Sequence, residues 1–187
     1  LIPIIIIAIL ATSSSAAIVE EKQCANLHAN YTGGYQGIYT DWEDDYQFNK
    51  FDPAKGELLS VCFDATLNGS IYARAENLGG SPVTGAYAKV IADMELELLD
   101  NESLPLHVEI NTGPENLSAH NTTDGILWLP TDGFTKFVEG NNSSSKCVPN
   151  VTPYIGSGTF NLTASTEADS TVGGSGAFMS ILETRGW

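Results

Sequence analysis

A run of acidic side chains beside a tryptophan is the stretch whose residue types could most directly bind a ligand. Residues 39–45 read YTDWEDD, which places four carboxylates within five consecutive positions. The acids are Asp41, Glu43, Asp44 and Asp45, with Trp42 among them. Carboxylate oxygens suit Ca²⁺, but the spacing is not that of an EF-hand loop and no glycine supplies its sharp turn. We interpret the run first as a solvated loop, and second as a calcium site or, with Trp42, a carbohydrate contact.

Catalytic chemistry has little support in the rest of the chain. The nearest approach to the G-x-S-x-G turn of a hydrolase is GGSGA at residues 173–177, which lacks the final glycine. The three histidines, His28, His107 and His120, lie in polar surroundings and show no metal-ligand spacing. Acids are plentiful, but nothing marks a pair suited to glycoside hydrolysis. We therefore predict that the protein is not an enzyme and has no resident cofactor, calcium being the alternative.

Acceptor motifs for N-glycosylation are far more frequent than chance predicts. About two N-x-S/T motifs are expected from the composition, whereas nine are present. They begin at Asn30, Asn68, Asn101, Asn116, Asn121, Asn141, Asn142, Asn150 and Asn161. Because glycans need exposed attachment sites, the motifs also predict turns and outward strand faces. We infer a glycoprotein located outside the cell or on its surface.

Three cysteines are consistent with an exported chain. Cys24, Cys62 and Cys147 allow one disulfide and leave one thiol, and the spacing does not fix the connectivity. We favour a bridge between Cys62 and Cys147. No two cysteines are close enough in sequence to suggest a cysteine-based metal site.

The charge and the N-terminal segment bear on cellular location. A formal net charge of −15 repels nucleic acid and anionic lipid surfaces, so we exclude a nucleic-acid partner. Residues 4–10 form an apolar run, and small residues follow, with Ser15 and Ala17 at the two positions that signal peptidase reads. We interpret residues 1–17 as a signal peptide whose start is truncated. Two alternatives stay open: a retained anchor, and an isoleucine-rich strand that is donated to a neighbouring subunit.

Alternating apolar and polar residues predict strands through most of the chain. From Leu59 to Leu67 every second residue is apolar, which is typical of a strand with one face on a core. Asn68-Gly69-Ser70 is expected to turn the chain into a hairpin whose second arm covers residues 71–75. The stretch 83–99 also alternates, although its Ala, Glu, Leu, Met and Lys residues favour a helix by intrinsic propensity. We side with the alternation, because a helix would scatter the acids around its whole circumference.

The second half of the chain is expected to add several shorter strands. They cover residues 106–110, 126–129, 134–138, 154–164 and 177–182, with a loop at 141–153 and a turn at 170–176. Seven or eight strands without a convincing helix predict an all-β fold, an antiparallel β-sandwich or jelly-roll-like single domain after the apolar leader. The expected divisions are 1–17 as leader, 18–45 as a connecting segment and 46–187 as the sandwich.

Three stretches resemble a known family. They are FDPAKGELLSV, ATLNGSIYARAENLGGSPVTGAYAKVIADMELEL and YIGSGTFNLTAS, followed by a closing GGSGAFMSILE. The chain is similar here to the choice-of-anchor E domain of prokaryotic surface proteins. The shared positions are Phe51, Asp52, Pro53, Gly56, Leu58, Val61, Gly69, Ser70, Asn77, Ser81, Pro82, Gly156 and Gly158. The resemblance implies an exported all-β domain held at a cell surface, with no catalytic residues to carry over. The chain departs from the family in having no sorting motif before Trp187 and no tyrosine-rich final strand, which leaves the mode of attachment open.

These observations together predict a secreted or cell-surface, N-glycosylated β-sandwich with a structural or adhesive role. One alternative is a calcium-dependent or carbohydrate-binding module. Another is a subunit of an extracellular filament that assembles by strand donation. The expected partners are carbohydrate, other surface proteins or further copies of the same chain.

Overall fold

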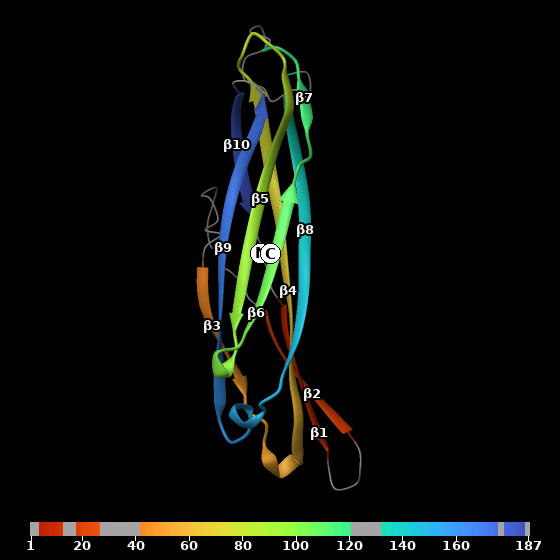
Figure 1. Ribbon diagram of the computed structural model, residues 1–187, viewed down its shortest axis with the longest axis vertical. Coiled ribbons are helices and arrows are strands. Elements are labelled where there is room, and N and C mark those ends of the chain that lie inside the picture. Colours follow the sequence, from red (N-terminus) through yellow and green to blue (C-terminus); the bar gives the residue numbers. More distant parts are fainter. Residues whose placement is uncertain (1–3, 13–17, 27–41, 121–131, 176–177, 186–187) are drawn as a thin grey trace.

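The protein is an elongated sandwich of two antiparallel sheets (Figure 1), seen here in a computed structural model that describes residues 4–12, 18–26, 42–120, 132–175 and 178–185. The strands are β1 (Ile4–Thr12), β2 (Ile18–Asn26), β3 (Trp42–Asn49), β4 (Glu57–Asn77), β5 (Val83–Glu97), β6 (Ser103–Asn111), β7 (Glu115–Leu117), β8 (Gly133–Val148), β9 (Thr159–Ser175) and β10 (Phe178–Arg185). Three short 3-10 turns, η1 (Pro53–Lys55), η2 (Leu99–Asn101) and η3 (Thr152–Tyr154), are the only helical elements among the described residues. The predicted all-β antiparallel sandwich is therefore confirmed.

One long strand organises the first sheet. β4 pairs along one side with β8, from Val61 opposite Val148 to Glu76 opposite Gly133. Its other side is divided between two shorter strands: β10 pairs with the second half of β4, and β1 pairs with the first half. β2 lies beyond β1 and completes the sheet.

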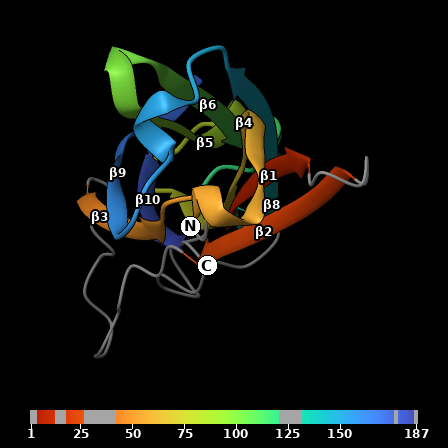
Figure 2. The same ribbon diagram turned by 90° about the horizontal axis from the view of Figure 1, so that it is seen from below.

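The second sheet has a similar plan. β5 pairs with β9 on one side, while β6 and the short β7 share its other side. β3 pairs with β9 and forms one edge of this sheet. Seen along the long axis, the two sheets face each other as two layers (Figure 2).

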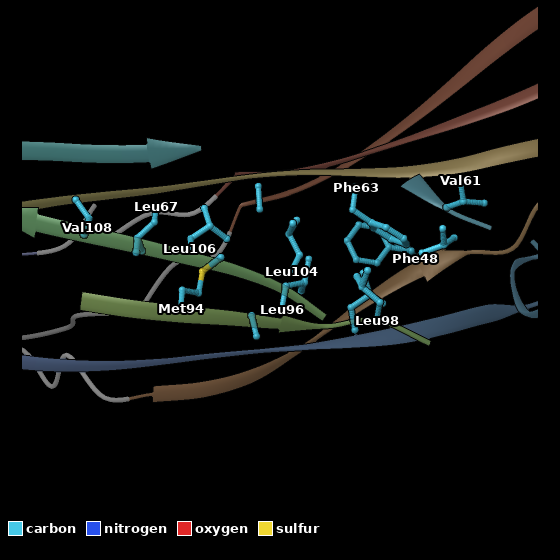
Figure 3. Close-up of a cluster of buried hydrophobic side chains, with 14 of the residues drawn as sticks. Phe48, Val61, Phe63, Leu67, Met94, Leu96, Leu98, Leu104, Leu106 and Val108 are labelled. Atoms are coloured by element: carbon cyan, nitrogen blue, oxygen red, sulfur yellow. The ribbon is translucent and has the colours of Figure 1, made fainter. Parts of the chain in front are cut away.

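The two layers enclose one large apolar core. Side chains of β4 such as Phe63 and Leu67 meet Met94 and Leu96 of β5 and Leu106 of β6 (Figure 3). These five residues are at most 3% exposed, and burying a side chain of this size stabilises the fold by about 1.5–3 kcal/mol. A second, smaller cluster at the other end of β4 and β5 consists mainly of small residues. Its members are Ala73, Ala75, Val83, Ala86, Ala88, Leu117 and Phe134.

The expected hairpin turn at Asn68-Gly69-Ser70 is wrong, because β4 continues without a break from Glu57 to Asn77. Gly69 and Ser70 pair with Gly140 and Glu139 of β8, and both are buried. The ladder to β8 overrides the local turn signal here, since a turn at this point would abandon those hydrogen bonds.

The alternation predicted the long strand after residue 83 correctly. β5 buries Val90, Ala92, Met94 and Leu96 and exposes the acids between them. Packing on a shared core therefore outweighs the helix propensity of these residues, as expected when one face of a strand is fully buried.

Three further expectations need correction. The stretch expected as a loop at 141–153 lies in β8 as far as Val148, and the turn expected at 170–176 lies in β9 as far as Ser175. The strand expected from Tyr154 begins only at Thr159, after the 3-10 turn η3. β8 pairs over its whole length with β4, and β9 pairs with β5 from Thr163 to Ser175, which satisfies the backbone of polar sequences that would otherwise favour turns. The strand expected at 126–129 lies outside the described residues.

Elsewhere the boundaries differ slightly from those expected. β2 and the first residues of β3 lie within the connecting segment 18–45, so strand structure begins before residue 46. Asp52 caps η1 by accepting a hydrogen bond from the backbone N–H of Ala54. No helix in the described part of the chain is long and apolar enough to cross a membrane.

The open side between β6 and β8 is closed by side chains instead of a backbone ladder. Lys136, Asn142 and Lys146 of β8 donate to the backbone carbonyls of Thr112, His107 and Ser103, at 2.8, 2.6 and 2.9 Å. Edge strands that keep free backbone acceptors invite pairing with other chains. These three bonds therefore cover the β6 edge.

We expect Leu96→Ala to destabilise the protein by about 2–5 kcal/mol, because it leaves a cavity in the large core. Leu59→Ala is the matched control, since Leu59 is 48% exposed on β4 and surface changes cost within about 0.5 kcal/mol. Urea unfolding followed by circular dichroism measures both values. Equal losses for the two variants would contradict the described core.

Candidate functional site

The acidic run lies on a strand and not in a loop. Glu43, Asp44 and Asp45 are exposed residues of β3, and Asp41 lies outside the described residues. Successive strand residues point to opposite faces, so Asp44 is directed away from Glu43 and Asp45. Asp44 accepts a hydrogen bond from the Tyr46 hydroxyl at 3.2 Å, and Asp45 accepts one from Thr163 at 2.7 Å. The described acids of this run therefore do not converge on a common point where Ca²⁺ could bind.

The acidic run affects the pKa of Tyr46, which lies next to it on β3. Burial of its ring, together with the nearby Asp44 carboxylate, raises the pKa of the phenol well above its usual range. The hydroxyl therefore stays protonated at physiological pH and continues to donate to Asp44.

Trp42 lies partly in the core and partly at the surface. It is half-buried and packs against the large core. Trp42 and Glu43 also border a groove of about 670 Å³, which acids of β5 and β9, among them Asp93, Glu95 and Glu167, line as well. The groove is thus acidic and open, with Trp42 as an aromatic residue at its border.

The sequon asparagines lie where glycans could be attached. Of the nine, Asn30 and Asn121 lie outside the described residues, Asn68 is half-buried on β4, and the other six are exposed. The exposed six are Asn101, Asn116, Asn141, Asn142, Asn150 and Asn161. They lie on both sheets and at the ends of strands, so glycans there would surround the molecule. The side-chain amide of Asn142 donates to the backbone carbonyl of His107, a bond that a glycan on this nitrogen would have to replace.

The cysteines pair as predicted. Cys62 of β4 and Cys147 of β8 are opposite each other in the ladder and form a disulfide. Cys24 on β2 is an exposed free thiol. The bridge joins strands that are 85 residues apart in sequence, so it fixes the central pair of the first sheet.

The two ends of the described chain meet on one edge of β4. The last strand, β10, ends with Arg185 opposite Ser70, and β1 begins with Ile4 opposite Thr66. Both strands run antiparallel to β4, so β1 continues the line of β10 along the same edge (Figure 1). On β5 the corresponding pair, β6 and β7, belongs to one continuous segment of chain. On β4 the pair comes from opposite ends of the chain.

The β1–β2 hairpin is held on the sandwich by a small number of contacts besides its ladder to β4. The side-chain amide of Gln23 donates to the backbone carbonyl of Asn49 at 2.9 Å and accepts from its backbone N–H at 2.8 Å. Lys55 forms an exposed ion pair with Glu21 at 3.0 Å, which contributes only about 0–1 kcal/mol. The β4 ladder is therefore the main attachment of the hairpin.

A second candidate site lies at the other end of β4. Glu76 at the end of β4, His120 after β7 and Asp132 before β8 bring their ligand atoms within 4.8 Å of one another. Among the described residues this is the one group of three or more His, Cys, Asp or Glu side chains that converges in this way. The three residues are separated by 44 and 12 positions, so no local motif marks the group. The pairing of β4 with β8 brings Glu76 close to Asp132, and the hydrogen bond from the His120 N–H to the Gly79 carbonyl places the histidine beside them.

Comparison with protein-family models, with curated protein sequences and with solved structures finds no match. The resemblance to choice-of-anchor E domains therefore stays a prediction. Function has to be argued from the two sites themselves.

We expect removal of the disulfide by Cys62→Ala with Cys147→Ala to cost about 2–5 kcal/mol, since the bridge restricts a long loop of the unfolded chain. Cys24→Ala, at the exposed free thiol, is the control and should leave the unfolding midpoint almost unchanged. Thermal unfolding without reductant measures the difference. A midpoint unaffected by the double substitution would contradict a formed bridge.

We also expect Asn161→Gln to lower the mass of the exported protein by one glycan while changing stability by less than about 0.5 kcal/mol, because the side chain is exposed. Mass spectrometry before and after enzymatic deglycosylation measures this. Asn49→Gln, at an exposed asparagine outside any sequon, is the control. The glycoprotein prediction fails if deglycosylation leaves the mass of the wild-type protein unchanged.

Proposed function

We propose that the protein is an N-glycosylated structural subunit of the cell exterior, and that it joins further copies of itself by exchange of the β1–β2 hairpin. The observation that carries this proposal is the edge of β4, which β10 covers only along residues 70–77 and β1 covers along residues 57–66. If β1 were removed, about half of the length of β4 would have no strand beside it on this edge.

The first support is the cost of leaving that edge open. Backbone N–H and C=O groups of β4 that lose the ladder to β1 must find another partner or water. An unpaired edge is also a template for a strand from another chain. The β6 edge differs, because side chains of Lys136, Asn142 and Lys146 from the same chain cover it.

The second support is the composition and register of β1. Its sequence is IIIIAILAT, and Ile5, Ile7 and Ile9 are opposite Ala65, Phe63 and Val61. Directly opposite residues of an antiparallel pair lie on the same face of a sheet. The three β4 residues in this register are fully buried in the core, so the sequence of β1 brings an apolar residue opposite each of them.

The third support is the length of chain that joins the hairpin to the sandwich. Residues 27–41 connect β2 to β3, and 15 residues can extend over about 50 Å. Such a connection permits the hairpin to dock on the β4 of its own chain or on the β4 of another. Exchange of an identical element is a low-cost route to association.

Exchange of the hairpin is compatible with two assemblies: a closed dimer whose two copies exchange hairpins reciprocally, and a linear chain of copies. The donated hairpin and the accepting edge are different surfaces, so a copy that receives one hairpin still has its own hairpin to donate. Head-to-tail contacts of this kind generate open filaments when the rotation between copies does not close a ring. The net charge of −15 would oppose lateral clumping of the filaments.

Covalent capture across two chains tests this proposal. We would place Ile5→Cys in one copy and Ala65→Cys in another, both with Cys24→Ser, because residues 5 and 65 are opposite each other. Opposite residues of an antiparallel pair fall within disulfide range. Mixing the two proteins under mild oxidation should give a product of twice the chain mass.

The control pairs Ile5→Cys with Asp64→Cys, one position out of register and on the opposite face of the strand. It should yield little product. A mixture that stays at single-chain mass for both combinations would contradict exchange between chains.

A second test perturbs the donor strand alone. Ile7→Pro removes a backbone donor from the middle of β1, whereas Ile7→Val preserves the ladder. We expect wild-type and Ile7→Val protein to form concentration-dependent oligomers, and Ile7→Pro to lose them. Light scattering after size-exclusion chromatography and negative-stain electron microscopy provide the measurement, and a wild-type protein that is monomeric at every concentration would overturn the proposal.

A further inference from the structure

The group of Glu76, His120 and Asp132 lies at the end of the sandwich away from the β1–β2 hairpin (Figure 1). Each residue comes from a different part of the chain: the end of β4, the segment after β7, and the residue before β8. We call this group the acid–histidine cluster. Its chemistry is independent of the strand exchange proposed above.

Backbone hydrogen bonds fix the three positions relative to one another. The N–H of His120 donates to the carbonyl of Gly79 at 2.9 Å, and the N–H of Asn77 donates to the carbonyl of Asp132 at 2.7 Å. The fully buried side chain of Asn77 adds bonds to the carbonyls of Ser81 and Ser118, at 2.7 and 2.6 Å. The cluster is therefore built on a rigid frame, as a ligand site requires.

Both separations from His120 are longer than a direct charged hydrogen bond, and the shorter one matches the spacing of two ligands on one metal ion. Nδ1 of His120 lies 3.4 Å from Oδ2 of Asp132 and 3.8 Å from Oε1 of Glu76. A charged hydrogen bond between such groups would be about 2.7–2.9 Å long. Ligand atoms on a tetrahedral ion with bonds of about 2.0–2.2 Å lie about 3.3–3.6 Å apart.

Burial of the two carboxylates favours a cation between them. The side chains of Glu76 and Asp132 are 1% and 3% exposed, and that of His120 is 18% exposed. Two carboxylates so close together in a dry environment repel each other unless a positive charge lies between them. Nδ1 of His120 is itself fully buried and makes no hydrogen bond within the described part of the chain, so its lone pair or proton faces the two acids.

The donor set indicates which ion fits. One imidazole nitrogen with two carboxylate oxygens suits Zn²⁺ and neighbouring divalent transition metals, whereas Ca²⁺ takes oxygen ligands alone. Three protein ligands would leave a fourth position for water. We propose that Glu76, His120 and Asp132 bind one Zn²⁺ ion, which joins the end of β4 to the segments that follow β7 and precede β8.

Such an ion would stabilise the end of the sandwich with the weaker apolar core. The smaller cluster there is rich in alanine, with Ala73, Ala75, Ala86 and Ala88 among its seven members. Alanine buries little apolar surface, so each contributes less than a leucine would. Three metal–ligand bonds would connect segments that the core holds only lightly.

The test is a titration of the full-length, chelator-treated protein with ZnCl₂ alone. Isothermal titration calorimetry should give one high-affinity Zn²⁺ ion per chain, and the thermal midpoint should rise with Zn²⁺ because binding favours the folded state. CaCl₂ at the same concentrations should produce no comparable rise. Replacement of Zn²⁺ by Co²⁺ should give a visible absorption band, which reports direct coordination without depending on stability.

The variants Glu76→Gln and His120→Gln are expected to lose the Co²⁺ band. They should also weaken Zn²⁺ binding by more than about 100-fold, because loss of a residue that merely supports a metal ligand already costs roughly 10–100-fold. His107→Gln is the matched control, because His107 is 56% exposed and pairs with Asp93 at 2.6 Å outside the cluster. It should retain both signals. Circular dichroism of each variant without metal identifies any that has failed to fold, and the Co²⁺ spectrum of the folded ones then decides.

Two results would overturn the proposal. One is wild-type protein that takes up no Zn²⁺ and shows no Co²⁺ band. The other is binding that Glu76→Gln and His120→Gln leave intact, which would locate the ion elsewhere on the acidic surface. Neither result would affect strand exchange, whose test depends on residues 5 and 65.

Discussion

Pairing of the β4 backbone on both of its sides is the constraint on which the rest of the structure depends. β4 is 21 residues long, and each of its buried N–H and C=O groups needs a partner. β8 supplies those partners along one side, with a disulfide between the two strands. No single strand covers the other side, so β10 and β1 divide it. The core, the disulfide and the candidate assembly edge all follow from this one strand.

The same constraint explains why the outer side of β6 and the side of β4 that faces β1 are covered in different ways. The β6 edge is covered within the described chain by side chains of β8, including two lysines that also pair with Glu102 and Glu115. The β4 edge is covered by backbone from the N-terminal segment. A side-chain cover stays with its own molecule, whereas a backbone cover on a long connection can be exchanged between molecules.

The two ends of the sandwich are stabilised by different means. At the end near η1 and η3, aromatic rings of Phe48, Phe63, Tyr154 and Phe160 pack at centroid distances of 5.1–5.7 Å, which adds about 0.5–1.5 kcal/mol per pair beyond burial. At the other end, alanines replace the rings, and the buried side chains of Glu76, Asn77 and Asp132 occupy the boundary. Buried polar groups stabilise a fold only when their hydrogen bonds are satisfied, so that end depends on polar contacts such as those of Asn77.

The sequence by itself determined the fold class and the long strand at 83–97, because burial of one face of a strand leaves a period-two pattern of apolar residues. It did not determine that Asn68-Gly69-Ser70 runs straight or that residues 141–148 belong to a strand. Local turn preference is worth about 1 kcal/mol or less, and the continuous ladder between β4 and β8 outweighs it at both places. Tertiary structure alone decided that β1 continues β10 along β4, and that Glu76, His120 and Asp132 converge. Both depend on which strands lie side by side, and residues far apart in the chain carry no local sign of the neighbour they will meet.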